Sequence, residues 1–492
     1  MHISWRPKPG DKIFRPRRIK RYRLRRILGV PALFSAGYGD VGSSIYYALG
    51  VVALVALGAT PIVLAIAGII YIFNALTYAE GGAMIPEAGG SASFARHGFN
   101  DLIGFIAGWA LMLSYIVTMA ISAYTIPPYL SYFWPMLKDP VIGTAVSMAI
   151  ILFLMLINVL GVRESSRINI CFIGMDIATQ LTLVVLGVVL ILCVNPGVLF
   201  QHMFGEGNWP STQNLIFGNA IAALCFTGVE TVSQLAEETR QPAKRIPQAY
   251  ILMTVAVLVL FAGISIVALS AMTPQVLGDP VNGWARDPVA GIAANLPSAT
   301  LQSIFAPLVA VLAATILLTA TNAGLMGISR LAFNLSSHHQ LPAALGRVHH
   351  RFRTPYVTII LFCLTALLVL TPGFFTAGFF ADLGALYVFG SLLCFALAHA
   401  AILSLRAKKP ELSRPFKIGW TVRVRGREMP MTAILGLAST SIIWVVVVIT
   451  QPYSRWVGIA WMIIGLIIYC LYRRKQHMPL THTALRQTKS NK

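Results

Sequence analysis

A glycine- and serine-rich stretch with a carboxylate interrupts the first long apolar segment of this 492-residue chain. Gly37, Gly42 and Ser43 surround Asp40 within residues 34–50. Glycine has a low helix propensity, and a charge at membrane depth is costly unless it has a function. The pattern predicts a membrane helix that breaks midway and turns freed backbone groups toward a polar solute, as the broken helices of secondary transporters do.

A second apolar segment, residues 213–236, combines the same features at mid-depth, where Gly228 and Glu230 lie close together. The two segments are spans 1 and 6 of the chain, so equivalent points are separated by five spans. This spacing predicts two five-helix repeats of inverted topology, with a binding site where the two breaks meet. The alternative is that Gly228 only permits close helix packing and that Glu230 pairs with a distant base.

The composition predicts an all-α membrane protein that positions these segments. The chain is 57% hydrophobic and only 11% charged, with a mean hydropathy of +0.73, whereas soluble domains carry about 25% charged residues. Segments of roughly 20 apolar residues are long enough to span a bilayer. Twelve are expected, at 28–53, 60–79, 101–132, 140–161, 168–194, 213–236, 248–272, 303–333, 355–372, 378–405, 431–450 and 455–472.

The net charge of +21 predicts topology and no nucleic-acid partner. Lys and Arg cluster in the N-terminal tail, the even-numbered connections and the C-terminal tail, and such clusters mark the cytoplasmic side. Both termini are therefore expected in the cytoplasm of a multi-pass protein of the inner or plasma membrane. The expected organisation is a basic tail (1–27), a ten-helix core (28–405, with repeats 28–194 and 213–405), a loop (406–430), two peripheral helices (431–472) and a tail (473–492).

Motifs for bound nucleotides, hydrolysis or metals are missing from the sequence. It has no GxxxxGK[ST] loop and no HExxH, so neither ATP-driven transport by this chain nor hydrolase chemistry is predicted. The chain is expected not to be an enzyme and to use no cofactor or metal. Energy would come from an ion gradient, with H⁺ favoured over Na⁺.

Several motifs resemble the amino acid–polyamine–organocation superfamily, in the same order as in that family. They are Tyr78–Ser91, Gly104–Trp109, Leu235–Pro247, Ser329-Arg330, Leu341-Pro342 and Thr354-Pro355. The resemblance covers about residues 28–405. It implies the LeuT-like fold, with a 5+5 inverted repeat, discontinuous helices 1 and 6, and two peripheral helices. It also implies a permease for amino acids or related amines, with many members coupled to protons or exchange.

Span 1 departs from the motif of that family. Amino acid permeases carry Gly-(Ser/Thr)-Gly-Ile-Phe, whose backbone N–H groups hold the substrate carboxylate. This chain has Gly42-Ser-Ser-Ile-Tyr46, so Ser44 replaces the second glycine, and Asp40 lies just before it. A carboxylate beside the pocket would repel a substrate carboxylate unless it is protonated.

Span 1 is instead similar to that of the potassium-uptake branch, the KUP and KimA-type importers. The resemblance continues through hydroxyl and carboxylate groups in spans 3, 6 and 10, which are hard oxygen ligands of the kind a dehydrated alkali cation needs. KimA-type proteins carry a further acid in span 3, where this chain has Ser114. The frame therefore resembles amino acid permeases, and the site partly resembles potassium importers.

Span 5 contains a candidate coupling residue. Similar proton-coupled transporters carry a Lys about seven residues after the span-5 Asn, and counting from Asn169 gives Asp176. A buried Asp can cycle between protonated and charged forms, or it can ligate Na⁺ together with Thr319 or Thr321. The alternative is a water-exposed Asp near the cytoplasmic end of the span with no role.

These observations predict a secondary transporter that imports an amino acid or small amine, by proton symport. A proton-coupled potassium importer is the second hypothesis, and a transport-incompetent sensor or channel is the third. The expected partners are a small-molecule or cation substrate and the lipid bilayer, and the oligomeric state stays open. The candidate substrate-binding residues are Gly37, Asp40, Gly42, Ser43, Ser44, Tyr47, Tyr115, Thr118, Ser122, Phe226, Thr227, Gly228, Glu230 and Tyr387, and the candidate coupling residues are Asp176, Thr319 and Thr321.

Overall fold

A computed structural model describes residues 26–161, 166–352, 354–376, 378–424 and 426–481. The expected basic tail (1–27) lies outside the described residues apart from its last two positions. The expected C-terminal tail (473–492) lies outside them beyond residue 481.

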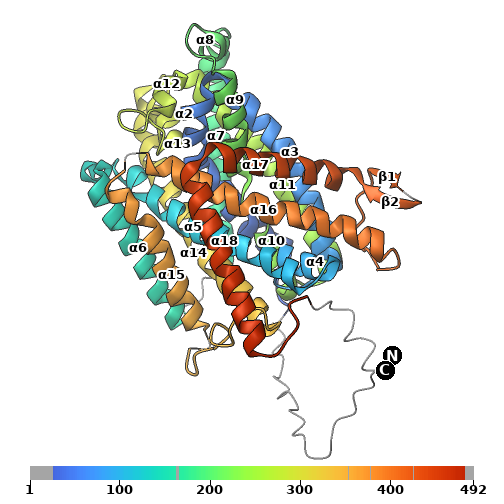
Figure 1. The fold of residues 1–492 in the computed structure, drawn as a ribbon. Helices are drawn as coiled ribbons and strands as arrows, with labels where there is room; N and C mark the ends of the chain where they lie inside the picture. The colour runs from blue at the N-terminus through green and yellow to red at the C-terminus, as the bar shows by residue number, and fades with distance from the viewer. Residues whose placement is uncertain (1–25, 162–165, 353, 377, 425, 482–492) are drawn as a thin grey trace, which may run out of the picture.

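The described residues form helices and one small hairpin (Figure 1). The helices are α1 (Val30–Val41), α2 (Ile45–Ala56), α3 (Thr60–Met84), α4 (Ser91–Gly98), α5 (Asp101–Leu130), α6 (Pro140–Leu160), α7 (Ser166–Gly187), α8 (Val198–Phe204), α9 (Thr212–Ala222), α10 (Thr231–Gln234), α11 (Pro242–Ala271), α12 (Pro274–Gly278), α13 (Pro288–Ala294), α14 (Ala299–Ser337), α15 (Tyr356–Leu370), α16 (Phe379–Lys408), α17 (Met431–Thr450) and α18 (Pro452–Lys475). Strands β1 (Thr421–Val424) and β2 (Arg427–Pro430) pair antiparallel between α16 and α17.

Eleven segments of the described chain are long and apolar enough to cross a membrane. The first runs from Val30 to Met84, over 55 residues, and covers the expected spans 28–53 and 60–79 except for residues 28 and 29. The chain turns between them at Leu57, where φ is +45°. Helices suit a bilayer because they satisfy every backbone polar group internally. The all-α membrane class is thus shown, while the number twelve stays a prediction.

Local sequence signals fix several helix ends. The side chain of Asn100 accepts a hydrogen bond from the Ile103 N–H (3.0 Å) at the start of α5. Asp139 accepts from the N–H of Val141 at 2.9 Å at the start of α6. Both are N-cap residues that satisfy otherwise unpaired amides. Gly161 ends α6 with φ +74°, a left-handed conformation that glycine adopts without strain.

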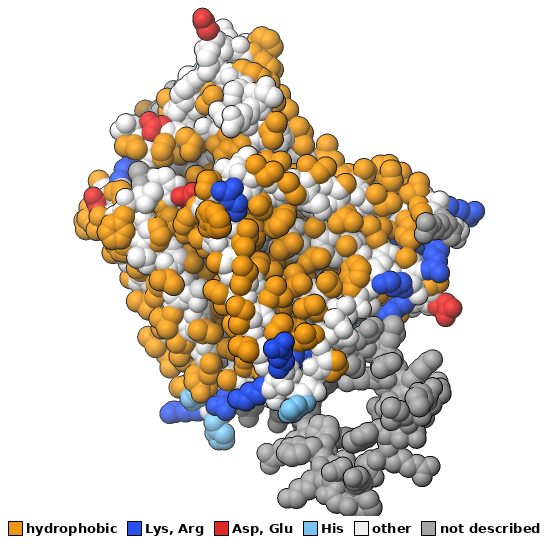
Figure 2. Space-filling view, in the orientation of Figure 1, with side chains coloured by type: hydrophobic (Ala, Val, Ile, Leu, Met, Phe, Trp, Pro, Cys, Tyr) orange, Lys and Arg blue, Asp and Glu red, His pale blue; other side chains and the backbone are white. Residues whose placement is uncertain are grey.

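Helix α5 lies at the centre of the molecule and packs against α4, α14 and α16. Helices α6, α15 and α18 lie at the outside of the bundle (Figure 1), where apolar side chains cover the surface (Figure 2). The peripheral α18 is fixed to α5 by a pair of indole rings. Trp109 and Trp461 stack at 4.6 Å, and each indole N–H donates to the other residue's carbonyl oxygen, at 2.7 and 2.9 Å.

Candidate substrate-binding site

Span 6 is broken at mid-depth. Helix α9 ends at Ala222 and is followed by a 3-10 turn, Ala223–Phe226, before α10 begins at Thr231. Thr227 is extended (ψ 159°), and Gly228 has φ +94°. Side chains other than hydrogen are strained at that φ. A Cβ at Gly228 would also lie 2.7 Å from Asp40 Cγ. Glycine is therefore required here both by the backbone and by the neighbouring carboxylate.

Span 1 is not broken, and the expectation of a discontinuous helix 1 is corrected. The backbone continues from α1 to α2 through a 3-10 turn, Gly42–Ser44, with right-handed helical dihedrals. The N–H of Gly42 donates to Tyr38 O, and that of Ile45 to the carbonyls of Gly42 and Ser43. The Ser43 hydroxyl donates to Asp40 O at 2.7 Å. These contacts keep the turn helical and occupy the Gly42 amide, one of those expected to face the substrate.

Asp40 and Glu230 lie together where α1 faces the break. Asp40 is 2% exposed, and its Oδ2 accepts a hydrogen bond from the hydroxyl of Thr231. Its Oδ1 has no hydrogen-bond partner among the described residues. Glu230 is fully buried, and neither of its carboxylate oxygens accepts a hydrogen bond there. The two carboxylates interact electrostatically with each other.

No basic side chain of the described chain compensates these two acids. Asp40 is buried, and its carboxylate is hydrogen-bonded to the Thr231 hydroxyl. Glu230 is also buried, and its carboxylate interacts with Asp40 and with the peptide N–H groups of Gly228 and Glu230 itself. Unpaired buried carboxylates are costly, and such groups concentrate at functional sites. The pair therefore forms an electronegative centre that a cation or a proton would stabilise.

Hydroxyl and aromatic side chains surround this centre. The hydroxyl of Tyr115 is buried without a hydrogen-bond partner in the described part of the chain. Ser122, two turns further along α5, also has a buried hydroxyl with no partner there. Tyr115 and Tyr387 both interact electrostatically with Asp40 and Glu230. These residues come from α5 and α16, so four elements, α1, α5, α10 and α16, or the residues directly beside them, contribute polar groups to one place.

Other expected residues lie beside the centre, but their polar groups form hydrogen bonds with other residues. Thr118 and Thr227 donate to carbonyls of their own turns, Ser114 O at 2.9 Å and Leu224 O at 2.8 Å. Tyr47 shares a hydrogen bond with Ser44 at 3.1 Å. Gly37 faces Val232 and Met253 and serves close packing. Ser114 pairs with Ser391 at 2.8 Å.

One wall of the site is apolar. Phe226, the last residue before the break, packs against Tyr71 in α3 with ring centroids 5.2 Å apart. Phe226 also packs against Phe261 in α11, with ring centroids 5.4 Å apart. The Tyr71 hydroxyl has no hydrogen-bond partner among the described residues.

Asp176 is buried in a network that the sequence did not reveal. It is 1% exposed, so the alternative of a water-exposed Asp is wrong. Its carboxylate accepts hydrogen bonds from Tyr46, from Tyr38 at 3.3 Å and from Gln180 at 2.8 Å. The network joins α7 to both halves of span 1.

Thr319 and Thr321, expected beside Asp176, share no hydrogen bond with it. Each hydroxyl donates to a carbonyl of α14, Thr315 O at 3.0 Å and Leu317 O at 2.8 Å. A shared Na⁺ site of Asp176 with these threonines therefore has no support in the structure. Thr319 does lie near Gly39 of α1, with its methyl 3.9 Å from the position of a Cβ there.

The site is covered from both ends of the bundle. At one end, Leu28 and Thr239 form a parallel bridge, and Arg330 in α14 pairs with Glu238 at 2.9 Å. At the other end α2 packs directly on the segment before α13, where a Cβ on Gly50 would lie 2.1 Å from Ala285 O. Contacts between elements of the described chain therefore close the bundle at both of these places.

A family model described as "Amino acid permease" matches residues 28–470. The chain belongs to this family. It is 29% identical over 479 residues to the branched-chain amino acid permease BcaP of Bacillus subtilis (strain 168), covering 92% of this chain and 94% of the relative. It is 27% identical to the methylthioribose transporter of the same organism, covering 97% and 99%.

A mammalian relative is similar to this permease as well. The large neutral amino acids transporter small subunit 2 of Rattus norvegicus is 26% identical over 436 residues, covering 86% of this chain and 75% of the relative. These comparisons support the superfamily resemblance. They do not support the expected likeness of the site to potassium importers.

Sequence reasoning missed Thr231, Tyr38, Tyr46 and Gln180. Thr231 follows Glu230 directly, at the end of the predicted break. Gln180 lies four residues after Asp176, on the same helical face. Both could have been found from spacing alone, whereas the tyrosine contacts depend on how α1 and α7 pack.

Proposed function

We propose that this permease is a secondary transporter that imports an amino acid or small amine by proton symport. One observation carries the proposal: two buried carboxylates, Asp40 and Glu230, meet at the break in span 6 without a basic partner among the described residues. Names of relatives such as the branched-chain amino acid permease support the substrate class.

The ammonium group of the substrate would be recognised first. Asp40 Oδ1 and the Glu230 carboxylate are the unpaired acceptors of the site, and an ammonium group offers only donors. A substrate carboxylate has fewer donors, because amides of Gly42 and Ile45 are used within span 1 and the Glu230 carboxylate lies near the amides of the break.

Proton coupling would use one of the buried acids. When ammonium leaves the site, Asp40 and Glu230 repel each other at close range, and a shared proton relieves that repulsion. Asp176 is a second candidate, since three hydrogen-bond donors hold it between α7 and span 1. A change of charge there would alter the contact between these elements.

During the transport cycle, the two ends that are closed in this structure would open in turn. We propose the LeuT-like 5+5 inverted repeat for residues 28–405, with repeats 28–194 and 213–405, two peripheral helices in 431–472 and both termini in the cytoplasm. Opening at the Leu28–Thr239 end and at the Gly50–Ala285 end would then be mutually exclusive, as alternating access requires.

Potassium import is the second candidate, and the same oxygen cluster favours it. Asp40, Glu230 and Tyr115 carry unpaired oxygen atoms and interact electrostatically with one another, and alkali cations bind oxygen ligands. The aromatic wall of Tyr71, Phe226 and Phe261 favours an organic substrate instead, because an apolar side chain buries its surface against such rings.

Uptake by the purified protein in liposomes tests the proposal. Labelled amino acids, labelled small amines and labelled Rb⁺ are offered in parallel under an imposed inward proton gradient. We expect saturable uptake of an amino acid or amine that stops when a protonophore collapses the gradient. Rb⁺ uptake without any response to organic solutes would replace the proposal by the second candidate, and no uptake of any class would refute transport.

A further inference from the structure

The loop between α16 and α17 ends in a hairpin that has one apolar, exposed face. Val422 and Val424 share one face of β1, because alternate residues of a strand lie on the same side, and Trp420 directly precedes the strand in the same alternation. Trp420, Val422 and Val424 are 57%, 39% and 46% exposed. A soluble protein would rarely leave such a group uncovered, and here it lies in a chain segment with four basic residues and one acidic residue, 416–430.

The hairpin lies at the level where α17 enters the bundle. Pro430 ends β2, and α17 begins at the next residue, Met431. The Met431 N–H donates to Trp420 O at 2.9 Å, so Trp420 is at the height of the first turn of a membrane span. Figure 1 shows the hairpin just beyond the ends of α16 and α17, at the right of the view. Tryptophan is enriched at that depth of a bilayer.

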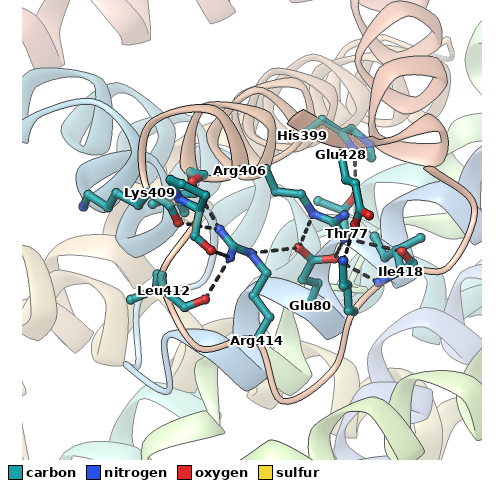
Figure 3. A network of polar contacts seen from close by, with 12 residues as sticks. Thr77, Glu80, His399, Arg406, Lys409, Leu412, Arg414, Ile418 and Glu428 are labelled. Carbon is teal, nitrogen blue, oxygen red and sulfur yellow. Dashed lines mark hydrogen bonds and ion pairs between the residues drawn. The ribbon is translucent and has the colours of Figure 1, made fainter. Parts of the chain in front are cut away.

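A buried ion-pair network holds the base of the hairpin in place (Figure 3). Glu80 at the end of α3 is fully buried, and Arg406 at the end of α16 binds both of its carboxylate oxygens. The Ile418 N–H donates to the same carboxylate at 3.1 Å. Arg414 bonds carbonyls of the loop, among them Lys409 O at 2.8 Å. The loop is therefore fixed to the helices two residues before Trp420.

The charges of the hairpin are divided between its faces. Arg427 lies opposite Val424 in the pairing of the strands, and so shares the apolar face. Arg423 lies opposite Glu428 on the other face, where Glu428 also pairs with Lys417. Arg427 is thus the basic side chain left at the edge of the apolar face, with no acid opposite it in the described hairpin.

We propose that the 420–430 hairpin is an interfacial anchor that binds anionic lipid of the cytoplasmic leaflet. Trp420, Val422 and Val424 enter the headgroup layer, and Arg427 contacts lipid phosphate. An indole at the interface with a basic residue beside it matches the chemistry of that layer. The Glu80 network holds the anchor at a fixed height relative to α3 and α16.

The test uses the full-length protein in liposomes with brominated acyl chains, which quench nearby tryptophan. The chain has nine tryptophans, so the signal of Trp420 is taken as the difference between the wild type and Trp420→Phe. We expect this signal to be quenched, and to be quenched at lower lipid content when the brominated lipid is phosphatidylglycerol than when it is phosphatidylcholine.

Arg427→Gln is the decisive variant, and Arg423→Gln is its matched control on the opposite face. Arg427→Gln should weaken the preference for phosphatidylglycerol by roughly fivefold, the effect of one basic residue near an anionic surface, while Arg423→Gln should keep it. Trp420 emission that brominated lipid leaves unchanged and acrylamide quenches would overturn the proposal and leave the face to a soluble partner. Equal quenching in both lipids would also overturn it.

Discussion

The hydroxyl of Thr231 donates a hydrogen bond to Asp40 Oδ2 across 191 residues of sequence. The contact joins the helical span 1 to the broken span 6 at the place where both approach the unpaired Glu230 carboxylate. Substitutions at these three positions therefore report on the site more directly than those in the surrounding helices.

Asp40→Asn should raise the KM of uptake at least about tenfold, because a hydrogen bond between charged groups contributes roughly 1.5–3 kcal/mol. The amide keeps the shape of the side chain, and its oxygen still accepts from Thr231. Asp382→Asn, in the first turn of α16, is the control. An unchanged KM in Asp40→Asn would place the ammonium group elsewhere.

Glu230→Gln should leave the protein folded in the membrane and slow transport at least about tenfold, equivalent to about 1.4 kcal/mol. The neutral side chain can neither hold a proton for coupling nor attract a cation. Proteoliposome uptake at several pH values measures the effect, with the exposed Glu206→Gln as the control. Full transport with the wild-type pH profile would remove Glu230 from the mechanism.

Glu80→Gln should destabilise the protein by about 3–5 kcal/mol, because removing one partner of a buried pair strands the other charge. Arg406 is 4% exposed and would be left without its carboxylate. Thermal unfolding in detergent measures the loss, and Lys417→Gln in the exposed pair with Glu428 is the control expected to change nothing. If both variants unfold alike, the network does not stabilise the loop.

Asp287 gives a pH-dependent stability at the end of the bundle near α13. Burial raises its pKa from 3.8 to about 7, although the charges of Lys138 and Arg286 act in the opposite direction; Tyr129 also faces it. A raised carboxyl pKa favours the protonated folded state, so its contribution is complete below pH 3.8 and is lost as the pH rises through about 7.

Asp287→Asn should therefore be more stable than the wild type at pH 8, by an amount on the order of a few kcal/mol, and equally stable near pH 4. Unfolding temperatures across this range measure the difference. A stability difference that is the same at every pH would mean that Asp287 titrates normally in the folded protein.

Topology can be read from introduced cysteines, in a background with the exposed Cys171 and Cys193 replaced. Asn282→Cys, in the exposed loop before α13, should react with an impermeant reagent added to intact cells. Ser413→Cys, in the exposed loop after α16, should react only after the membrane is opened. Labelling of Ser413→Cys from outside would reverse the orientation inferred from the basic residues.

Composition and spacing were sufficient for the membrane class and for the break at Gly228. Apolar length is a direct requirement of the bilayer, and an acid beside a glycine at mid-depth is too costly to be kept in a plain membrane helix. Span 1 shows the limit of the same reasoning. Its glycines and serines permit unwinding, but the Tyr38 ring against Gly42 and the Ser43 hydroxyl on Asp40 O keep it helical.

Partners of the buried acids could not be predicted because they depend on packing between distant helices. Asp176 was singled out from its spacing to Asn169, yet its donors Tyr38 and Tyr46 lie more than a hundred residues away. The threonines of α14 that were expected beside it bond carbonyls of their own helix instead. Residue type indicated that Asp176 needs partners, and only the fold determines which ones.

The ion pairs at the end of the bundle near α4 also impose an order on biosynthesis. Glu80 and Arg406 are 326 residues apart, and Asp101 and Arg473 are 372 apart. At about 5–20 residues per second, the ribosome needs roughly 15–65 s to reach Arg406 after Glu80 has emerged. Until then the early spans stay in the translocon or bilayer with uncompensated acids. This end of the permease is therefore completed last, and a chain truncated before α16 is left with Glu80 buried without its basic partner.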